Sequence, residues 1–309
     1  MKESKSAFIA IIGRPNVGKS SLINKILPHK IAAVSSKPQT TRTRIMGVLT
    51  EKENQIVFID TPGFHKPRNV LGENMVKAVN LGLSDVDAAI LVVDAAPKFK
   101  FNPEELPPAE KELIEVIKKR KIPAILAINK IDLVKNKEDL LEIIIAYNKY
   151  HKFDAVVPIS ALDGNGVNEL VDEAMKFVRE SIHYFADDDI TDQPERVLVS
   201  EIIREKLLRL LDKEIPHGIA VDLEQFYERD NKNGEPIIEV NAVIYCERNS
   251  HKGVIIGKNG AMLKKVGTLS RKDIEEFFGC KCSLKLWVKV KEGWRNNPAS
   301  IHNFGLDIQ

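Results

Sequence analysis

The sequence predicts an α/β fold, a mostly parallel six-stranded sheet flanked by helices, followed by a smaller α+β domain. Three observations lead to this prediction. Short apolar runs alternate with amphipathic stretches over the first 180 residues, an acidic stretch without periodicity comes next, and a different order of elements follows it. The length of 309 residues also suggests two domains.

The strands of the first domain are predicted at buried apolar runs, and its helices lie between them. The strands are residues 8–12, 55–60, 88–94, 124–129 and 155–160, and the helices are residues 19–27, 74–83, 108–120, 137–150 and 167–180. Strands that alternate with helices in this way form a mostly parallel sheet with helices on both faces. The stretch RIMGVLTEKENQIVFID differs, because two strands meet at a polar turn near residues 52–54 and should pair antiparallel.

The stretch ADDDITDQPE is acidic, contains proline and lacks periodicity, so it is the predicted linker. We therefore place the first domain at residues 1–185, the linker at 186–195 and the second domain at 196–309. The second domain has the predicted order helix, strand, strand, helix, helix, strand. Its first two strands flank DNKNG, which is a hairpin signal.

The charge of the chain is balanced overall but uneven along it. The formal net charge is +2, whereas residues 191–247 carry 7 Lys and Arg against 13 Asp and Glu, and residues 248–295 carry 12 against 4. A basic block of this size is typical of a surface that binds a polyanion, although a solvated helical face can have the same composition.

The cysteine content and the hydropathy of the chain indicate the cellular compartment in which the protein is expected. Cys246, Cys280 and Cys282 form a small, odd set that fits a reducing environment, and CKC has no second Cys or His pair near it for zinc. Cys280 and Cys282 are expected to pack at a strand edge. The N-terminus lacks the apolar core of a signal peptide, and no apolar run approaches the ~18 residues of a membrane span. We expect a cytoplasmic protein.

The stretch GRPNVGKS matches G-x-x-x-x-G-K-[ST] between a predicted strand and a predicted helix, the context that a phosphate-binding loop requires. Glycines let backbone N–H groups surround phosphates, the lysine reaches the β- and γ-phosphates, and the serine hydroxyl can ligate Mg²⁺. The predicted phosphate-binding residues are Gly13, Arg14, Pro15, Asn16, Val17, Gly18, Lys19 and Ser20.

The stretch DTPGF begins at Asp60, the last residue of the predicted strand at residues 55–60, and its place after the phosphate loop and a hairpin makes it a second nucleotide motif. Asp60 is placed to hold Mg²⁺ through water, and the Gly63 N–H can contact a γ-phosphate. Taken alone, Asp before Pro-Gly is also a common turn. The residues of this motif are Asp60, Thr61, Pro62, Gly63 and Phe64.

The stretch NKID ends another strand and predicts selection of guanine. The Asp132 carboxylate can accept hydrogen bonds from guanine N1–H and from its 2-amino group, and adenine offers neither donor. Asn129 can bond the base edge and tie this loop to the phosphate loop, and the Lys130 stem can cover one face of the base. Backbone N–H groups of Ser160 and Ala161 can meet guanine O6.

The chain thus carries four motifs in order: GRPNVGKS, DTPG, NKID and SAL, the last at residues 160–162. In this order they resemble the motifs of the translation-factor-type GTPases. By that resemblance KPQTTRTRI is the first switch segment, and either Thr40 or Thr41 supplies a hydroxyl to Mg²⁺ in the GTP state. Phe64 departs from the Ras-like pattern, which has a water-orienting glutamine there. Similar members of the branch have an asparagine at the position of Asn16 that helps coordinate K⁺, so K⁺ is a second candidate cation. Arg14 and Arg42 are alternative cationic groups, and slow turnover is expected.

A second glycine-lysine loop, VIIGKNGAML, lies in the basic block. It has no Ser or Thr after its lysine and too short a gap between glycines, so it is not a second phosphate loop of this type. It matches G-x-x-G, the turn with which KH domains clamp a nucleic-acid backbone. We expect Ile255, Ile256 and Met262 to line a groove for bases. The predicted RNA-binding residues are Ile256, Gly257, Lys258, Asn259, Gly260, Lys264 and Lys265.

Nearly end to end, the chain resembles the Era family of bacterial GTPases, in which a G domain precedes a type II KH domain. The resemblance rests on KPQTTRTRI, DTPGFHKP, EIIREKLLRLLDKEIPH, KGVIIGKNGAMLKKVGTLSR and VKVKEGW. It implies a monomer that binds GTP and GDP, binds the 3′ end region of small-subunit ribosomal RNA, and assists ribosome maturation. Three alternatives stay open: another GTPase of the same branch, an RNA-binding module whose G domain only holds nucleotide, and a GTPase peripheral to the cytoplasmic membrane.

Overall fold

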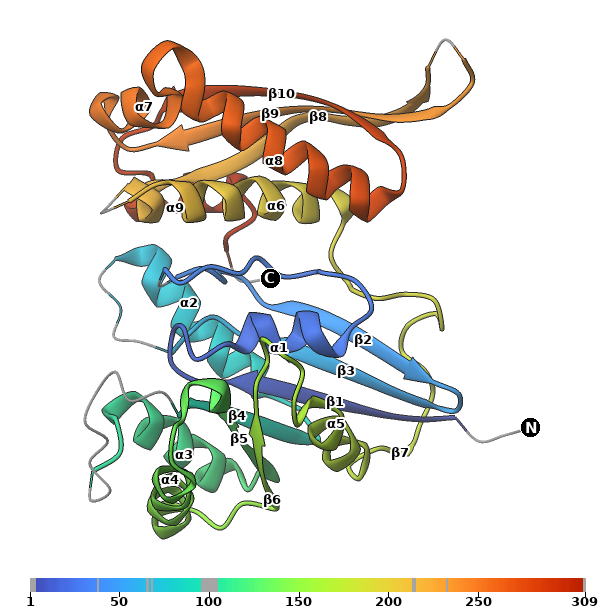
Figure 1. Cartoon of the computed structure of the whole chain (residues 1–309), viewed down its shortest axis with the longest axis vertical. Coiled ribbons are helices and arrows are strands. Elements are labelled where there is room, and N and C mark those ends of the chain that lie inside the picture. The colour runs from blue at the N-terminus through green and yellow to red at the C-terminus, as the bar shows by residue number, and fades with distance from the viewer. Residues whose placement is uncertain are drawn as a thin grey trace. The chain divides into compact units, whose positions relative to one another are not determined.

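A computed structural model describes residues 4–37, 39–64, 67, 69–95, 105–212, 215–231 and 233–307 (Figure 1). The chain forms two compact units. Unit 1 comprises Met1–Ala32, Thr41–Pro67 and Met75–Asp192, and unit 2 comprises Ala33–Thr40, Arg68–Asn74 and Gln193–Gln309. Two short segments from early in the sequence therefore pack with the C-terminal part of the chain. Within the described residues, we find no helix with the length and apolar character needed to span a membrane.

The sheet of unit 1 has the strand order β2-β3-β1-β4-β5-β6, with a short β7 paired to β1. The strands are β1 (Lys5–Ile12), β2 (Ile45–Glu51), β3 (Asn54–Asp60), β4 (Ala88–Asp94), β5 (Ala124–Asn129), β6 (Ala155–Ile159) and β7 (Arg179–Glu180). All neighbours pair parallel except β2 with β3 and β7 with β1. The mostly parallel sheet and its antiparallel hairpin agree with the sequence prediction.

One predicted helix ends earlier than expected. The helix predicted for residues 167–180 is observed as α5 (Val167–Met175), and the described sheet gains β7 as a seventh strand. The N–H groups of Phe177 and Val178 bond to carbonyls three residues back, which tightens the last turn and ends the helix. The next two residues pair with the first residues of β1, so the ladder satisfies backbone groups that a longer helix would have used.

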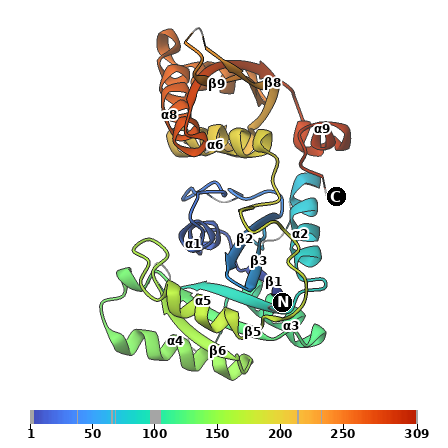
Figure 2. The same ribbon diagram turned by 90° about the vertical axis from the view of Figure 1, so that its right-hand side faces the viewer.

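Helices cover both faces of this sheet (Figures 1 and 2). α1 (Lys19–Ile26) and α5 contact each other on one face. On the other face, α2 (Val70–Gly82), α3 (Pro108–Arg120) and α4 (Lys137–Tyr150) contribute apolar side chains to one core cluster with β1, β4 and β5. Successive side chains of a strand point to opposite faces of the sheet. A strand that is covered by helices on both faces is therefore apolar throughout.

The carboxyl ends of the parallel strands meet at one edge of the sheet, and this arrangement positions the site. Asp94 at the end of β4 lies opposite Asn129 at the end of β5, and Asn129 lies opposite Ile159 at the end of β6. Asp60 at the end of β3 pairs with Ile11 near the end of β1. Ligands of open α/β sheets bind at this edge.

Unit 2 contains a three-stranded sheet with the order β10-β9-β8, whose helices α6 to α8 share one core cluster with it. Its elements are α6 (Glu195–Leu210), β8 (Ala220–Asp230), β9 (Pro236–Cys246), α7 (Asn249–Ile256), α8 (Ala261–Phe278) and β10 (Lys281–Val290). This is the predicted order. β8 and β9 pair antiparallel, whereas β10 pairs parallel with β9. As expected, Cys282 packs on β10, which is an edge strand.

The C-terminal segment packs separately from the main helices of unit 2. Trp294 and Ile301 form a small apolar cluster with Ala220 and Tyr245, and α9 (Pro298–Asn303) lies apart from α6 and α8 (Figure 2). The Trp294 indole N–H donates to the carbonyl of Gly218 at 2.9 Å. The buried indole therefore anchors the C-terminal segment to the start of β8.

Candidate nucleotide site and candidate nucleic-acid interface

The loop of residues 13–20 joins β1 to α1, and its backbone requires glycine at two positions. Gly13 has φ 152°, and a Cβ there would lie 2.3 Å from the carbonyl oxygen of Val92. Gly18 has φ 103°, and a Cβ there would lie 2.2 Å from the side-chain nitrogen of Asn129. Both glycines are thus required by conformation and by close packing against the ends of β4 and β5.

Lys19 opens α1 and folds back over the loop. Its side chain is 5% exposed, and Nζ donates to the carbonyls of Gly13 at 3.1 Å and of Arg14 at 3.0 Å. Burial lowers the pKa of Lys19 to about 8, and the nearby Asp60 carboxylate opposes this shift. The ammonium group is therefore held beside the loop backbone, at the start of a helix where phosphates bind favourably.

Ser20, Thr41 and Asp60 converge at the end of β3. Ser20 Oγ lies 2.7 Å from Thr41 Oγ1 and donates to Asp60 Oδ2 at 2.8 Å. Burial raises the pKa of Asp60 to about 6, while Lys19 and the hydroxyls lower it. Asp60 Oδ1 is buried and has no hydrogen-bond partner within the described residues. Three hard oxygen donors with one unpaired carboxylate oxygen fit Mg²⁺, which prefers such ligands.

The two threonines of the first switch segment have different surroundings. Thr41 faces Ser20 and Asp60, whereas Thr40 Oγ1 donates to the carbonyl of Lys37 at 2.6 Å. The Thr40 carbonyl accepts a hydrogen bond from Arg204, within unit 2. Thr41, and not Thr40, is therefore the residue that this geometry brings to the candidate metal ligands.

The segment after β3 approaches the phosphate loop closely. A Cβ at Gly63 would lie 2.7 Å from Cα of Pro15, and the Phe64 N–H donates to the carbonyl of Gly13 at 3.1 Å. Thr61 Oγ1 donates to the carbonyl of Ile11 at 2.9 Å, which fixes the first turn of the segment to β1. Pro62 lies between these anchored residues. Glycine at position 63 thus lets this segment pack directly against the phosphate loop.

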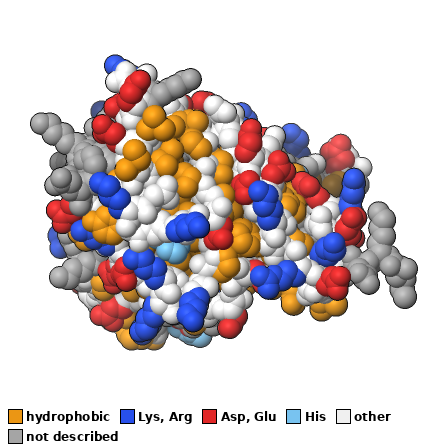
Figure 3. Space-filling model, turned by 90° about the horizontal axis from the view of Figure 1, so that it is seen from below, with side chains coloured by type: hydrophobic (Ala, Val, Ile, Leu, Met, Phe, Trp, Pro, Cys, Tyr) orange, Lys and Arg blue, Asp and Glu red, His pale blue; other side chains and the backbone are white. Residues whose placement is uncertain are grey.

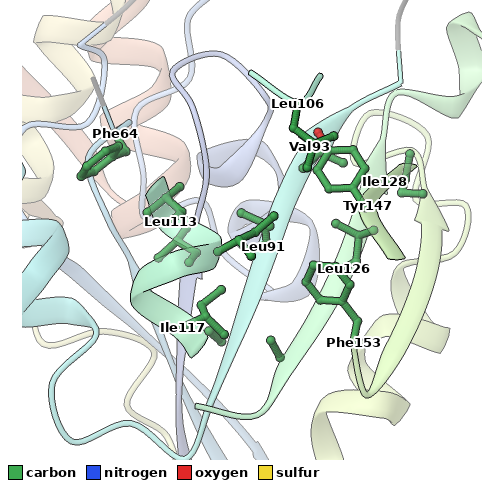
Figure 4. Close-up of a cluster of buried hydrophobic side chains, with 14 of the residues drawn as sticks. Phe64, Leu91, Val93, Leu106, Leu113, Ile117, Leu126, Ile128, Tyr147 and Phe153 are labelled. Atoms are coloured by element: carbon green, nitrogen blue, oxygen red, sulfur yellow. The ribbon is translucent and has the colours of Figure 1, made fainter. Parts of the chain in front are cut away.

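Phe64 is a core residue. Its ring is 7% exposed and belongs to the cluster that contains Leu91 and Leu113 (Figure 4). An apolar ring in this environment offers no hydrogen bond to water. Activation of water at this site therefore needs another group, as the sequence indicated.

The loops after β5 and β6 are joined by Asn129. Its Nδ2 donates to the carbonyl of Val17 at 2.7 Å, and its Oδ1 accepts from the N–H groups of Lys130 at 2.8 Å and Ala161 at 2.9 Å. The Ser160 hydroxyl donates to Asp132 Oδ1 at 2.7 Å. One buried amide thus connects the phosphate loop to both loops of the candidate base site, and Ser160 orients the exposed Asp132 carboxylate.

Lys130 also contacts the phosphate loop. Its Nζ donates to the carbonyl of Asn16 at 2.8 Å and forms an ion pair with Asp94 at the end of β4. Asn16 has φ 65°, in the left-handed region that asparagine tolerates better than most residues. The predicted nucleotide-site residues therefore gather at one edge of the sheet, in unit 1, with the exception of Thr40.

Two residues that contact predicted site residues were not identified from the sequence. Asp94 pairs with Lys130, and Glu110 of α3 accepts from Arg14 Nε at 2.5 Å. A signal for each is present in the sequence. Asp94 ends an apolar strand, where site residues of parallel sheets lie. Glu110 occupies the same helical face as Leu113, Ile114 and Ile117, so it is a carboxylate on an apolar face.

The G-x-x-G turn of unit 2 lies between α7 and α8, and three of its residues have positive φ angles. Gly257 has φ 74° and ψ 173°, and a Cβ there would lie 2.7 Å from Cβ of Met262. Asn259 is left-handed with φ 52°, and Gly260 has φ 77° with open space where a Cβ would be. Lys258 and Asn259 are exposed. The turn therefore has open space beside the backbone of Gly260 and one exposed cation, Lys258.

The surroundings of this turn are basic on one side and apolar on the other. Lys264 and Lys265 on α8 are exposed, and neither forms an ion pair within the described residues. Ile256 and Met262 are partly buried. The expectation that Ile255 lines a groove is wrong, because Ile255 is fully buried in the core of unit 2. By contrast, basic and acidic side chains are mixed with apolar ones over the face seen from below in Figure 3.

Comparisons with known proteins agree with both halves of the chain. Residues 8–130 match the family model described as 50S ribosome-binding GTPase, and residues 214–295 match the KH domain model. The chain is 50% identical to GTPase Era of Clostridioides difficile (strain 630) over 303 residues, which cover 98% of this chain and 99% of that protein. It is 47% identical to GTPase Era of Alkaliphilus metalliredigens (strain QYMF), with the same coverage.

Two solved structures are similar over nearly the full length. Era in complex with MgGDPNP and nucleotides 1506–1542 of 16S ribosomal RNA has a TM-score of 0.91 and 36% identity, covering 99% of this chain and 100% of that one. A variant of Aquifex aeolicus Era bound to GDP and AlF₄⁻ has a TM-score of 0.90 and 37% identity, covering 98% and 100%. With its guanine-nucleotide site in unit 1 and its KH turn in unit 2, the chain belongs to the Era family of GTPases.

Proposed function

We propose that this GTPase is a switch whose second unit binds the 3′ end region of 16S ribosomal RNA and that it assists maturation of the small ribosomal subunit. The observation that carries the proposal is the presence, in one chain, of a guanine-nucleotide site and a basic G-x-x-G turn. The similar Era structure with 16S RNA, which aligns over 99% of this chain, supports the RNA class.

The nucleotide-site roles that we propose follow the observed contacts. The loop of residues 13–20 would bind the phosphates, with Lys19 reaching the β- and γ-phosphates. Ser20 and Thr41 would ligate Mg²⁺, and Asp60 would hold it through water. Mg²⁺ bound there would neutralise the charge that develops on the phosphate oxygens. Asp132 would select guanine, with Asn129, Lys130, Ser160 and Ala161 forming the rest of the base site.

We also propose that K⁺ assists turnover beside Asn16. The buried Phe64 ring cannot orient water, so another group has to assist hydrolysis, and a cation beside the phosphates would stabilise the negative charge that develops there. The left-handed backbone at Asn16, fixed by Lys130, supports a defined position for its side chain.

For unit 2, we propose that Gly257 to Gly260 meet the sugar-phosphate backbone and that Lys258, Lys264 and Lys265 supply charge. Ile256 would contact bases. The protein would act as a monomer in the cytoplasm, and the same basic surface would also support peripheral contact with the cytoplasmic membrane. Competition between RNA and anionic liposomes in a sedimentation assay separates these two uses.

Crosslinking of the GTP-bound protein in cells, followed by sequencing of the bound RNA, tests the proposal. We expect reads concentrated at the 3′ end of 16S ribosomal RNA. A variant with Lys258→Asp and Asn259→Asp serves as the matched control and should lose those reads. Reads spread evenly over all ribosomal RNA, or unchanged in the variant, would contradict the proposed target.

A further inference from the structure

Glu110 is an ionisable residue in the core of unit 1. It lies on the buried face of α3 and is 0% exposed, and both of its carboxylate oxygens are used by other elements. Oε1 accepts from Arg14 Nε of the phosphate loop at 2.5 Å, and Oε2 accepts from the hydroxyl of Tyr147 on α4. Tyr147 itself is buried beside Val93 and Ile128 (Figure 4).

A carboxylate at this position is costly for folding. Burial raises the pKa of Glu110, and the Arg14 guanidinium and the Tyr147 hydroxyl oppose that shift only in part. An apolar residue at the same position would fill the core without this desolvation penalty, and buried ion pairs often contribute little net stability. The contact with Arg14 therefore needs a reason other than packing.

Arg14 connects Glu110 to the reactive end of the phosphate loop. The Arg14 carbonyl accepts from Lys19 Nζ at 3.0 Å, so the backbone that Glu110 anchors is also the backbone that holds this lysine. Two residues later, the Asn16 carbonyl accepts from Lys130, which is paired with Asp94. Residues 14–16 are thus fixed at both ends, by Glu110 through Arg14 and by Asp94 through Lys130.

We propose that Glu110 is a positioning residue for GTP hydrolysis: by holding the side chain of Arg14, it fixes the backbone of residues 14–16 and so places Lys19 and Asn16 against the phosphates. The proposal rests on the proposed binding of GTP phosphates at this loop. It gives Arg14 the role of an anchor rather than that of a cation for the transition state. Misplacement of catalytic groups by about 1 Å can slow a reaction roughly a hundredfold, so even a partial loss of the anchor is measurable.

Steady-state GTP hydrolysis by the full-length protein tests the proposal with Glu110→Gln, Arg14→Gln and the double variant. Glu110→Gln keeps the size of the side chain and an acceptor for Tyr147 but removes the charge that faces Arg14. We expect each single variant to lower kcat about tenfold and to change KM for GTP by less than about threefold, because the base site is untouched. The double variant should be no slower than the slower single variant, because both changes break one contact.

Asp87→Ala is the matched control for lost stability. Asp87 precedes β4 at the opposite edge of the sheet, and its Oδ2 accepts from the Phe8 N–H at 2.8 Å. This variant should lower Tm and leave kcat unchanged. Arg14→Lys, which keeps the charge, should retain more of the wild-type kcat than Arg14→Gln does, and it provides a readout if Glu110→Gln does not fold.

Three results would overturn the proposal. Wild-type kcat in the folded Glu110→Gln or Arg14→Gln variant would leave the pair a purely structural role, as would an equal loss of kcat in Asp87→Ala at an equal loss of Tm. Multiplicative losses in the double variant would show that the two residues act separately. These outcomes are distinct from failure of the proposed function, which would appear as absence of GTP binding by the wild-type protein.

Discussion

The hydroxyl oxygens of Ser20 and Thr41 lie 2.7 Å apart, and both face Oδ2 of Asp60, at 2.8 Å and 3.4 Å respectively. Ser20 comes from the first turn of α1, whereas Thr41 comes from the segment before β2. Two residues from different segments are thus brought to one carboxylate. The cluster combines a candidate ligand on a helix with a candidate ligand on a loop, as expected where a loop responds to the nucleotide.

Thr41→Ala should slow the Mg²⁺-dependent hydrolysis of GTP while leaving the affinity for GDP nearly unchanged. We expect kcat to fall about tenfold or more and the Mg²⁺ concentration for half-maximal turnover to rise, because one hydroxyl ligand is lost. Thr40→Ala is the matched control, since its hydroxyl bonds to Lys37. Steady-state hydrolysis rates over an Mg²⁺ titration check this. An equal effect of the two substitutions would contradict the assignment of Thr41 as the Mg²⁺ ligand.

Asp132→Asn should weaken GTP binding and favour xanthosine triphosphate, whose 2-oxo group meets the new amide. The loss of two charge-assisted hydrogen bonds should cost on the order of 3 kcal/mol. Ser160→Ala removes only the hydroxyl that orients this carboxylate, so its effect should be smaller and should not change base preference. Competition titrations with the two nucleotides measure both effects. Unchanged GTP affinity in Asp132→Asn would refute the assignment.

GTP turnover should be faster in KCl than in NaCl at equal ionic strength, and Asn16→Ala should erase the difference. The reason is that K⁺, unlike the buried Phe64 ring, can supply positive charge beside the phosphates. Initial rates in the two salts measure the effect. Equal wild-type rates would exclude a catalytic role for the ion.

A variant with Lys258→Asp and Asn259→Asp should bind single-stranded RNA at least tenfold more weakly, about 1.4 kcal/mol, because two negative charges then face the RNA backbone. GTP affinity and Mg²⁺ dependence should not change, since both residues are exposed in the turn of unit 2. Wild-type binding should fall steeply with salt, because binding releases counterions from phosphates. Fluorescence anisotropy with labelled RNA measures both. A folded variant that keeps RNA affinity but loses GTP would show the two loops to be assigned wrongly.

The strands and most of the site could be predicted because their signals are local. Apolar runs that end in Asp60 and Asn129 place these polar groups at the carboxyl edge of a parallel sheet, whichever residues surround them. Gly13, Gly18 and Gly257 were recognised from spacing alone, and their observed φ values and close contacts explain why that spacing contains glycine.

The remaining features depend on contacts between residues far apart in sequence. Nothing near Thr40 or Thr41 reveals which of them faces Ser20, because the choice depends on the path of the whole segment. The pairing of Arg14 with Glu110, 96 residues later, likewise follows from the packing of α3. The early end of α5 arises because β1 offers ladder partners to residues 179 and 180, which helical periodicity alone does not show.

The path of the chain after β7 has a consequence for aggregation. β2 is an edge strand of its sheet, and edge strands can pair with those of other molecules. Here the Val48 N–H donates to the carbonyl of Ile190, the Met46 N–H donates to Asp192, and Thr191 forms a bridge with Gly47. The acidic stretch before unit 2 therefore covers this edge. A G domain cut after residue 185 would expose it to self-association, whereas one cut after residue 192 would keep it covered.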